Sequence, residues 1–183
     1  MADGYQAASV DEIARRAGVS KATLYSYFPE KALLFMEVAR SECARQADTA
    51  LASMDDSAPP VQVLGGTARH FLGFLLSEFG QRVFRICVAE SDRFPELGRE
   101  FYRSGPALMR ARMVAYLEAA VARGDLAIED CQLAADQFAE LCKADLFPRL
   151  VFGIDTQFSE AEIERVISGA LETFMARYGP RGG

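Results

Sequence analysis

The strongest local signals lie near the start of the chain, where two helix starts, a glycine and a proline follow one another. Ser9 precedes Glu12 by three residues, the spacing of a capping box, so a short helix is expected to run from Ser9 to Gly18. Ser20 is placed to cap a second short helix, and Pro29 ends it because proline has no N–H for the next helical hydrogen bond. The sequence therefore predicts two short helices joined by a tight glycine turn.

The rest of the chain favours helices throughout. It lacks the period-two alternation of half-buried strands, and Ala, Leu, Glu and Arg dominate between glycines and prolines. We therefore predict an all-α protein, in which Gly80 ends one helix and Pro148 kinks or shortens another. The helices expected after the first two cover residues 31–53, 60–79, 81–92, 106–123, 130–152 and 160–178, and a short segment at residues 95–104 lies between two of them.

The stretch MDDSAPP at residues 54–60 combines charges, a serine and two prolines, which is typical of a break between modules. Pro60 then suits the first position of the next helix. We predict a small helix-turn-helix domain over residues 1–54 and a larger helical domain over residues 55–183.

Composition limits what the protein can bind. The chain has 183 residues and a formal net charge of −6, so any attraction to nucleic acid must be local. No stretch reaches the roughly 18 uninterrupted apolar residues of a membrane-spanning helix. The first residues also lack the basic and apolar regions of a signal peptide. These features predict a cytoplasmic protein with no membrane partner.

The residues that commonly carry catalysis or bind metals are few. His70 is the single histidine, so no catalytic set can draw on a second imidazole. Cys43, Cys87, Cys131 and Cys142 are widely spaced and show no CxxC or Cys/His ligand spacing, so buried free thiols are expected. We predict that the protein is not an enzyme and has no metal site and no cofactor.

The two short helices have the helix-turn-helix pattern, in which the second helix enters the DNA major groove, about 12 Å wide. Lys21 places a cation in the first turn of that helix, where free backbone N–H groups also favour phosphate. Thr23 and Tyr25 offer hydroxyl groups, whereas Leu24 and Phe28 are expected to face the core. This face of the second helix is the predicted DNA contact.

Four further residues extend that surface. Ser26 and Tyr27 are placed to reach the groove, and Ala22 is small enough for the backbone to approach a base edge or a thymine methyl group. Lys31, at the start of the following helix, is expected to contact a phosphate.

The stretch SVDEIARRAGVSKATLYSYFPEKALLF resembles the helix-turn-helix of the TetR family of bacterial transcriptional repressors, over most of residues 3–40. The resemblance implies an all-helical dimer whose variable C-terminal domain holds a small-molecule pocket and the dimer interface. It maps the recognition helix onto residues 20–28 and a phosphate-contacting hydroxyl onto Ser9. The predicted DNA-binding residues are Ser9, Ser20, Lys21, Ala22, Thr23, Tyr25, Ser26, Tyr27 and Lys31.

The sequence departs from the family at its start. Members carry a first helix before the equivalent of DGYQAAS, and it packs on the other two helices; here Met1 lies two residues before Asp3. Four residues would then lose part of their apolar cover, namely Val10, Ile13, Ala14 and Leu24. Our hypothesis is that the sequence is a truncated or late-started version of a longer protein.

The second half carries a weaker resemblance. The stretches VAESDRFPELGREFYRSGP, AADQFAELCKADLF and GIDTQFSEAEI resemble the C-terminal domain of AefR-like members. Its aromatic and Met-rich residues suit either core packing or an apolar ligand cavity, with His70 as a polar contact. The predicted ligand-pocket residues are His70, Phe71, Phe74, Phe84, Cys87, Phe101, Met109, Met113 and Tyr116.

The last two long helices carry apolar stripes that exceed what one protomer is expected to need. A two-fold four-helix interface would cover them. The predicted dimer-interface residues are Phe138, Leu141, Leu146, Ile163, Val166, Ile167, Ala170 and Phe174.

These observations favour a homodimeric transcriptional regulator that binds double-stranded operator DNA and, as a repressor, is released by a small apolar or amphipathic effector. Two alternatives remain open at this stage. One is a helical small-molecule-binding protein or enzyme with a structural N-terminus. The other is a chain that lacks the family's first helix and acts only as a ligand-binding or dimerising module.

Overall fold

The computed structural model describes residues 10–31, 33, 34, 36–38, 40, 41, 44, 45 and 57–180, and every regular element in these ranges is a helix. The described residues between 31 and 45 are also helical. The all-α prediction is confirmed. The helices are α2 (Val10–Ala17), α3 (Lys21–Tyr27), α5 (Pro60–Leu76), α6 (Glu78–Glu90), α7 (Pro95–Ser104), α8 (Pro106–Arg123), α9 (Cys131–Lys143), α10 (Leu146–Val151) and α11 (Glu160–Tyr178).

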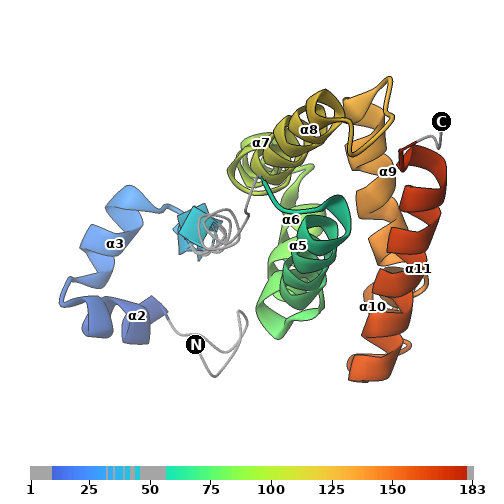
Figure 1. The fold of residues 1–183 in the computed structure, drawn as a ribbon. Coiled ribbons are helices and arrows are strands. Elements are labelled where there is room, and N and C mark those ends of the chain that lie inside the picture. The colour runs from blue at the N-terminus through green and yellow to red at the C-terminus, as the bar shows by residue number, and fades with distance from the viewer. Residues whose placement is uncertain are drawn as a thin grey trace.

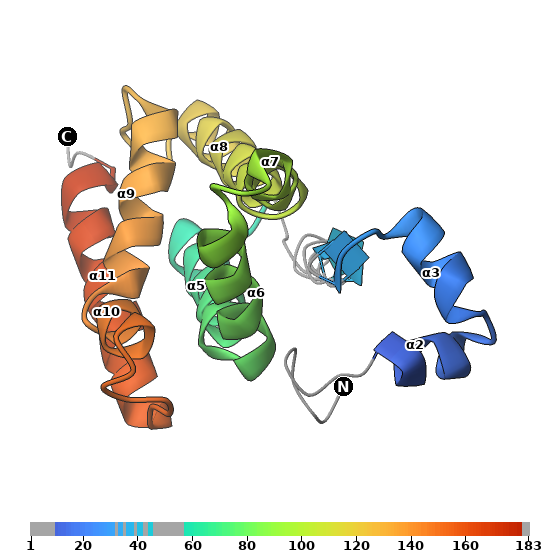
Figure 2. The same cartoon turned by 180° about the vertical axis from the view of Figure 1, so that it is seen from behind.

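The helices form a small N-terminal pair and a larger body. Figures 1 and 2 show α2 and α3 at one end of the molecule and α9, α10 and α11 at the other, with α5, α6, α7 and α8 between them. Within the body, α5 packs against α6, α9, α10 and α11, while α8 packs against α7 and α9. The two short N-terminal helices contact each other across their turn.

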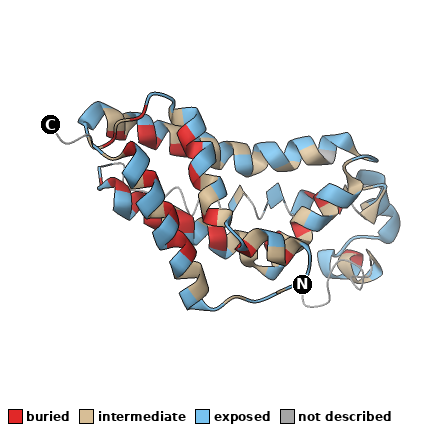
Figure 3. Ribbon diagram, turned by 90° about the vertical axis from the view of Figure 1, so that its right-hand side faces the viewer, coloured by how far each residue is buried: buried red, intermediate tan, exposed pale blue. Residues whose placement is uncertain are grey.

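The body holds one continuous hydrophobic core. Each long helix turns a buried side inward and leaves exposed positions on its other side (Figure 3). Tyr116 and Phe174 are the largest fully buried side chains, and the Tyr116 hydroxyl donates to the Ala58 carbonyl oxygen at 3.0 Å. That hydrogen bond satisfies the one polar group of a ring that is otherwise buried among apolar side chains. The start of α5 is thereby fixed against α8.

A second, smaller cluster joins the N-terminal part to the body. Met36 lies against Val83 and Cys87 of α6, and all three are buried. The Cys87 thiol lies 3.6 Å from Met36 Sδ. The partly buried residues around this cluster are Leu33, Phe79, Ile86, Phe94 and Phe101.

Several helix ends agree with the sequence prediction because their signals are local. Gly18 and Gly124 both have positive φ angles, +68° and +83°, where a side chain would be strained. Ser159 and Glu162 form the predicted capping box, with reciprocal side-chain to backbone hydrogen bonds. The helix at residues 106–123 has the predicted bounds, and the short segment at residues 95–104 forms a helix of its own.

Two predicted helix ends are wrong. Gly80 does not end a helix: α5 ends at Leu76, and Ser77 caps α6, whose first turn includes Gly80. A Cβ at Gly80 would lie 2.2 Å from the Phe74 carbonyl oxygen, so glycine is required for the close approach of the two helices.

The second error concerns Pro148. The helix ends before Pro148, at Lys143, and Ala144 and Asp145 separate it from α10. Asp145 has a φ of +60°, and Pro148 lies within the first turn of α10. N–H groups of a first helical turn have no intrahelical partner, so proline is tolerated there.

Most of the predicted dimer-interface residues lie inside the core of one protomer, and the interface itself stays a prediction. Six of the eight residues are buried inside the protomer, and Leu141 and Ile163 pack partly buried against the same core. These side chains pack into the core of one protomer, so the six buried ones have no surface to offer a second copy. The six buried residues are Phe138, Leu146, Val166, Ile167, Ala170 and Phe174.

In the described part of the chain, Cys87, Cys131 and Cys142 form no disulfide, and burial raises the pKa of Cys142 to about 12. The expectation of buried thiols is confirmed for Cys87 and Cys142, while Cys131 is half-buried and Cys43 lies outside the described residues. Across the described residues, none of the helices is long and apolar enough to cross a membrane. The same residues include no group of three potential metal ligands.

Candidate DNA-binding surface and effector region

The turn between α2 and α3 is closed by two backbone hydrogen bonds. The Val19 N–H donates to the Ala14 carbonyl oxygen at 3.0 Å, and the Gly18 N–H donates to that of Arg15 at 3.3 Å. This pair of bonds is the Schellman arrangement, which needs a left-handed residue at Gly18. The turn sets the angle between the two helices, and Ala14 is the buried residue of α2 that lies against it.

Ser20 caps α3, as predicted. Its Oγ accepts from the Thr23 N–H at 3.0 Å and lies 2.7 Å from Thr23 Oγ1. The Ser26 hydroxyl donates to the Thr23 carbonyl oxygen at 2.7 Å. The hydroxyl groups of the first two turns are therefore held in place before any partner arrives.

One face of α3, its free face, does not pack into the core. None of its residues is buried, and Tyr27 is 76% exposed while Tyr25 is 39% exposed. Leu24 and Phe28 are half-buried on the opposite side, as predicted. The exposed positions are Ser20, Lys21, Ala22, Thr23, Tyr25, Ser26 and Tyr27.

The cations of this module lie in ion pairs with two carboxylates of α2. Lys21 Nζ lies 2.9 Å from Asp11 Oδ1, and this hydrogen-bonded contact raises the pKa of Lys21. Glu12 accepts from both Arg15 and Arg16, whose hydrogen bonds lower the pKa of its carboxyl group. The Glu12 carboxylate is therefore a hydrogen-bond acceptor for these two arginines. Ser9, its predicted capping partner, lies outside the described residues.

Lys31 is half-buried at the start of the next helical segment rather than fully exposed. Its neighbour Glu30 forms a two-pronged ion pair with Arg93, which lies between α6 and α7; the Nη1–Oε2 and Nη2–Oε1 distances are both 3.0 Å. The Arg93 guanidinium also stacks 4.9 Å from the centre of the Phe94 ring. The end of the α3 segment is thus tied directly to the body.

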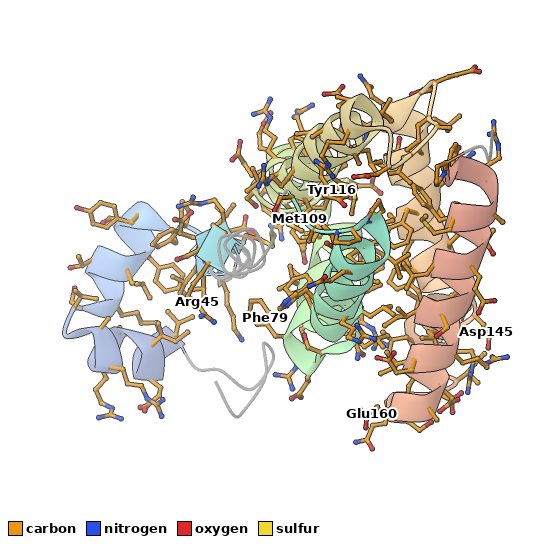
Figure 4. All side chains as sticks on the ribbon, in the orientation of Figure 1. Arg45, Phe79, Met109, Tyr116, Asp145 and Glu160 are labelled. Carbon is orange, nitrogen blue, oxygen red and sulfur yellow. The ribbon has the colours of Figure 1, made fainter. Side chains whose placement is uncertain are left out.

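The nine predicted ligand-pocket residues do not form one cluster. Phe71, Met113 and Tyr116 belong to the main core, whereas Cys87 and Phe101 belong to the smaller cluster. Figure 4 shows Met109 and Tyr116 on α8, and Phe79 on the side of α6 that faces the N-terminal helices.

The other members of that set lie elsewhere. Phe74 stacks edge-on against Phe79 with ring centres 6.3 Å apart. His70 is exposed on α5 and is not buried among the aromatic residues predicted to line a pocket with it. Apolar residues surround His70 on most sides of the helix, so the sequence pattern could not tell whether its side chain faces the core or solvent.

Phe84 lines a small cavity between α5, α6 and α10, of about 10 Å³, which is room for about one water molecule. Its ring lies edge-on to Phe147 with centres 5.3 Å apart, and Arg85 donates to the Leu150 carbonyl oxygen at 3.2 Å nearby. The lining residues are Leu75, Gln81, Phe84, Arg85, Phe147, Leu150 and Val151.

Thr67 of α5 is a polar residue that the sequence did not single out. Its Oγ1 is buried and has no hydrogen-bond partner among the atoms the structure describes. A buried hydroxyl without a partner is uncommon and costs stability. The sequence could not have predicted this. A threonine in an apolar helix usually donates its hydroxyl hydrogen to a backbone carbonyl of the preceding turn, and the sequence does not show when it fails to do so.

Together these features define a helical DNA-binding protein: a helix-turn-helix with a free face, attached to a helical body. Two family models agree. That of the AefR-like transcriptional repressor C-terminal domain matches residues 62–180, and that of bacterial regulatory proteins of the tetR family matches residues 1–38. The chain belongs to the TetR family of transcriptional regulators, and its C-terminal domain is of the AefR-like type. The predicted family is therefore confirmed.

Solved structures support the same assignment. A TetR-family transcriptional regulator from Mesorhizobium loti MAFF303099 is 30% identical, with a TM-score of 0.84 over 97% of this chain and 89% of that chain. The flavonoid-responsive regulator FrrA is 37% identical, with a TM-score of 0.76 over 98% of this chain and 90% of that chain. A regulator from Pseudomonas syringae pv. tomato str. DC3000 is 25% identical, with a TM-score of 0.68 over 98% and 90% of the two chains. Among curated protein sequences no match was found.

Proposed function

We propose that this regulator is a dimeric repressor that holds a near-palindromic operator through α3 and releases it when a small aromatic effector binds the body. The observation that carries the DNA-binding part is the free face of α3, where hydroxyl groups and one cation are fixed by a cap and an ion pair but cover no core. A two-fold dimer would place two such helices in successive major grooves.

Lys21 and Tyr25 provide the test of this surface. We expect Lys21→Ala to weaken binding on all DNA sequences and to reduce its salt dependence, because it removes a phosphate contact. Tyr25→Ala should weaken binding to the DNA upstream of the protein's own gene more than to random duplex. Unchanged gel-shift affinity in both variants, with the fold intact by circular dichroism, would refute these contacts.

The proposed effector is a planar aromatic molecule with hydrogen-bonding groups. Two observations support it: the buried, unpartnered Thr67 hydroxyl, and the many partly buried aromatic rings of α5, α6 and α7. FrrA, at 37% identity, is a flavonoid-responsive regulator. A phenolic ligand would satisfy the hydroxyl that the described residues leave without a partner. Flavonoids are therefore the first compounds to test.

Thr67→Val tests the role of this hydroxyl, because valine keeps the shape and removes the polar atom. Stability should be unchanged or slightly higher, since no hydrogen bond of the described structure is lost. The flavonoid concentration needed for DNA release should rise about tenfold or more, the cost of one buried hydrogen bond. An effector response equal to the wild type would show that Thr67 does not contact the ligand.

Release would pass through the contacts between the body and the N-terminal part. The Glu30–Arg93 ion pair and the Met36–Cys87 contact connect the segment after α3 to α6 and to the α6–α7 corner. A ligand that favours another position of this corner would move the recognition helices apart or together, within the limit set by its differential affinity. Arg93→Gln should weaken the effector's influence on DNA binding while leaving effector affinity nearly unchanged.

We propose that the dimer surface lies on the outer faces of the last helices, because most apolar residues of their inner faces are buried in the protomer core. The exposed side of α11 carries small residues, among them Ser168, Gly169 and Ala176, that would allow a second helix to approach closely. Phe152 and Ile154 follow α10 and are 79% and 69% exposed. A second copy would cover both side chains.

Gly169→Arg tests this surface. A Cβ at Gly169 meets nothing within 4 Å, so the protomer should tolerate arginine while a second copy would not. Gly73→Arg on α5 is the matched control, because Gly73 is equally open and exposed. Sedimentation should give a monomer for the first variant and a dimer for the second; two dimers would place the interface elsewhere.

A further inference from the structure

The charges of the helix-turn-helix are almost balanced internally. Residues 10–27 hold three cations, Arg15, Arg16 and Lys21, against two carboxylates, Asp11 and Glu12, a net charge of +1. Each of the three cations contacts one of the two carboxylates directly. The helix-turn-helix must approach DNA, which is negatively charged, and yet two of its own carboxylates are paired with its cations.

The Asp11–Lys21 pair differs from the other two in its position. Glu12 pairs with arginines three and four residues away within α2, whereas Asp11 reaches across the turn, ten residues along the chain, to the first turn of α3. Both side chains are well exposed, 65% for Asp11 and 52% for Lys21. Lys21 is also the one cation on the free face of α3.

The ammonium group of Lys21 is the same donor that a DNA phosphate would use. A phosphate that contacts Lys21 can displace the Asp11 carboxylate. Otherwise the phosphate must share the ammonium group with this carboxylate, which lies about 3 Å from the cation. In both cases the free energy of the internal pair, or the repulsion between two anions, opposes binding. Because phosphates are present in every sequence, the opposition acts on all DNA.

We propose that Asp11 is an intramolecular competitor of DNA phosphate at Lys21, and that it sets the affinity of the module for DNA below what its cations alone would give. The inference rests on the proposed contact between Lys21 and phosphate. Its consequence is a regulator that leaves non-operator DNA readily and that an effector of moderate affinity can release.

Asp11→Asn tests the proposal, because asparagine keeps the shape and removes the charge. The probes are a labelled random-sequence duplex of about three helical turns and the DNA upstream of the gene, at low salt. Affinity for both should rise about two- to fivefold for each module, the range expected from an exposed ion pair. The gain should shrink as salt rises, since screening weakens the internal pair.

Two controls separate this role from others. Glu129→Gln removes one exposed carboxylate on the loop between α8 and α9, and it should leave DNA affinity unchanged if bulk charge is unimportant. In a Lys21→Ala background, Asp11→Asn should have no effect, because the competitor has lost its cation. A structural role of Asp11 would instead lower affinity and would persist in that background.

The outcomes distinguish the inference from the proposed function. If Lys21→Ala weakens binding and Asp11→Asn strengthens it only when Lys21 is present, both stand. If Lys21→Ala weakens binding but Asp11→Asn has no effect or weakens it, the competitor role is overturned and the Lys21 contact is retained. If Lys21→Ala changes nothing, the Lys21 contact and the role of Asp11 are both overturned.

Discussion

The helix-turn-helix and the helical body use their side chains in opposite ways. In α2 and α3 Ala14 is the one buried residue, and α3 buries none at all. The body places a continuous set of side chains, from Val63 to Tyr178, in one core. The contrast teaches that the body supplies the stability of the described structure, whereas the conformation of α3 is held by a cap, a turn and ion pairs. Substitutions in the two regions should therefore separate stability from DNA binding.

The largest expected effect is on the core of the body. Phe174 is 1% exposed, and its ring packs against Phe138 and Tyr178 at centre distances of 5.3 and 4.9 Å. Phe174→Ala should lower the free energy of unfolding by about 3–5 kcal/mol, measured by urea denaturation. Glu172→Ala, exposed on the same helix, should change it by less than about 0.5 kcal/mol. Equal losses would contradict the assignment of α11's inner face to the core.

Next in size is the α5–α6 junction, where two glycines should respond with opposite sign. Gly80→Ala forces a methyl group against the Phe74 carbonyl oxygen and should cost about 1–3 kcal/mol. Gly73→Ala, with open space around its Cβ position, should stabilise the helix by about 0.5–1 kcal/mol. Thermal unfolding of the two variants checks both values, and a shared sign would rule out the close approach at Gly80.

A smaller and more local effect is expected in α3. Ser20→Ala removes the cap and should cost about 1 kcal/mol. Hydrogen exchange should then speed up for the amides of α3 and stay unchanged for those of α8. Ser20→Asn keeps a capping oxygen and should exchange like the wild type. Faster exchange throughout the protein would mean that α3 and the body unfold as one unit.

The smallest effect is a pH dependence at the α8–α9 contact. Arg110 donates two hydrogen bonds to Asp136, which lower the pKa of its carboxyl group below the ordinary 3.8. A lowered pKa in the folded state stabilises the protein above pH 3.8 and loses this contribution as the pH falls through the lower value. Asp136→Asn should lower the melting temperature slightly at pH 7 and not at pH 2, as scanning calorimetry can show. A difference that persists at pH 2 would point to packing rather than charge.

The sequence predicted best what depends on neighbouring residues. The cap at Ser159, the glycine ends at Gly18 and Gly124, and the bounds of α8 follow from side chains and backbone conformations within one helical turn. The helix-turn-helix falls in the same class, because its cap, turn and exposed hydroxyls lie within 20 consecutive residues. The division of the chain between residues 54 and 55 stays a prediction, since it lies outside the described residues.

What depends on contacts between distant segments was harder to predict. An apolar stripe such as Val166, Ile167 and Ala170 looks the same in sequence whether it covers its own core or a second copy. Gly80 is needed for an approach to Phe74 that only the folded pair of helices reveals. The ion pair between Glu30 and Arg93 joins residues 63 positions apart, and neither side chain stands out from other surface charges.

Tyr27→Ala tests the separation between the two regions most directly, because this side chain is 76% exposed on α3 and packs on no core. The measurement is a paired one: affinity for the DNA upstream of the gene by fluorescence anisotropy, and the urea midpoint of the same sample. We predict a loss of DNA affinity of about tenfold or more, in line with one lost contact to bases or backbone, with an unchanged urea midpoint. Unchanged DNA affinity, or a loss of affinity that follows a loss of stability, would contradict the assignment of DNA recognition to the free face of α3.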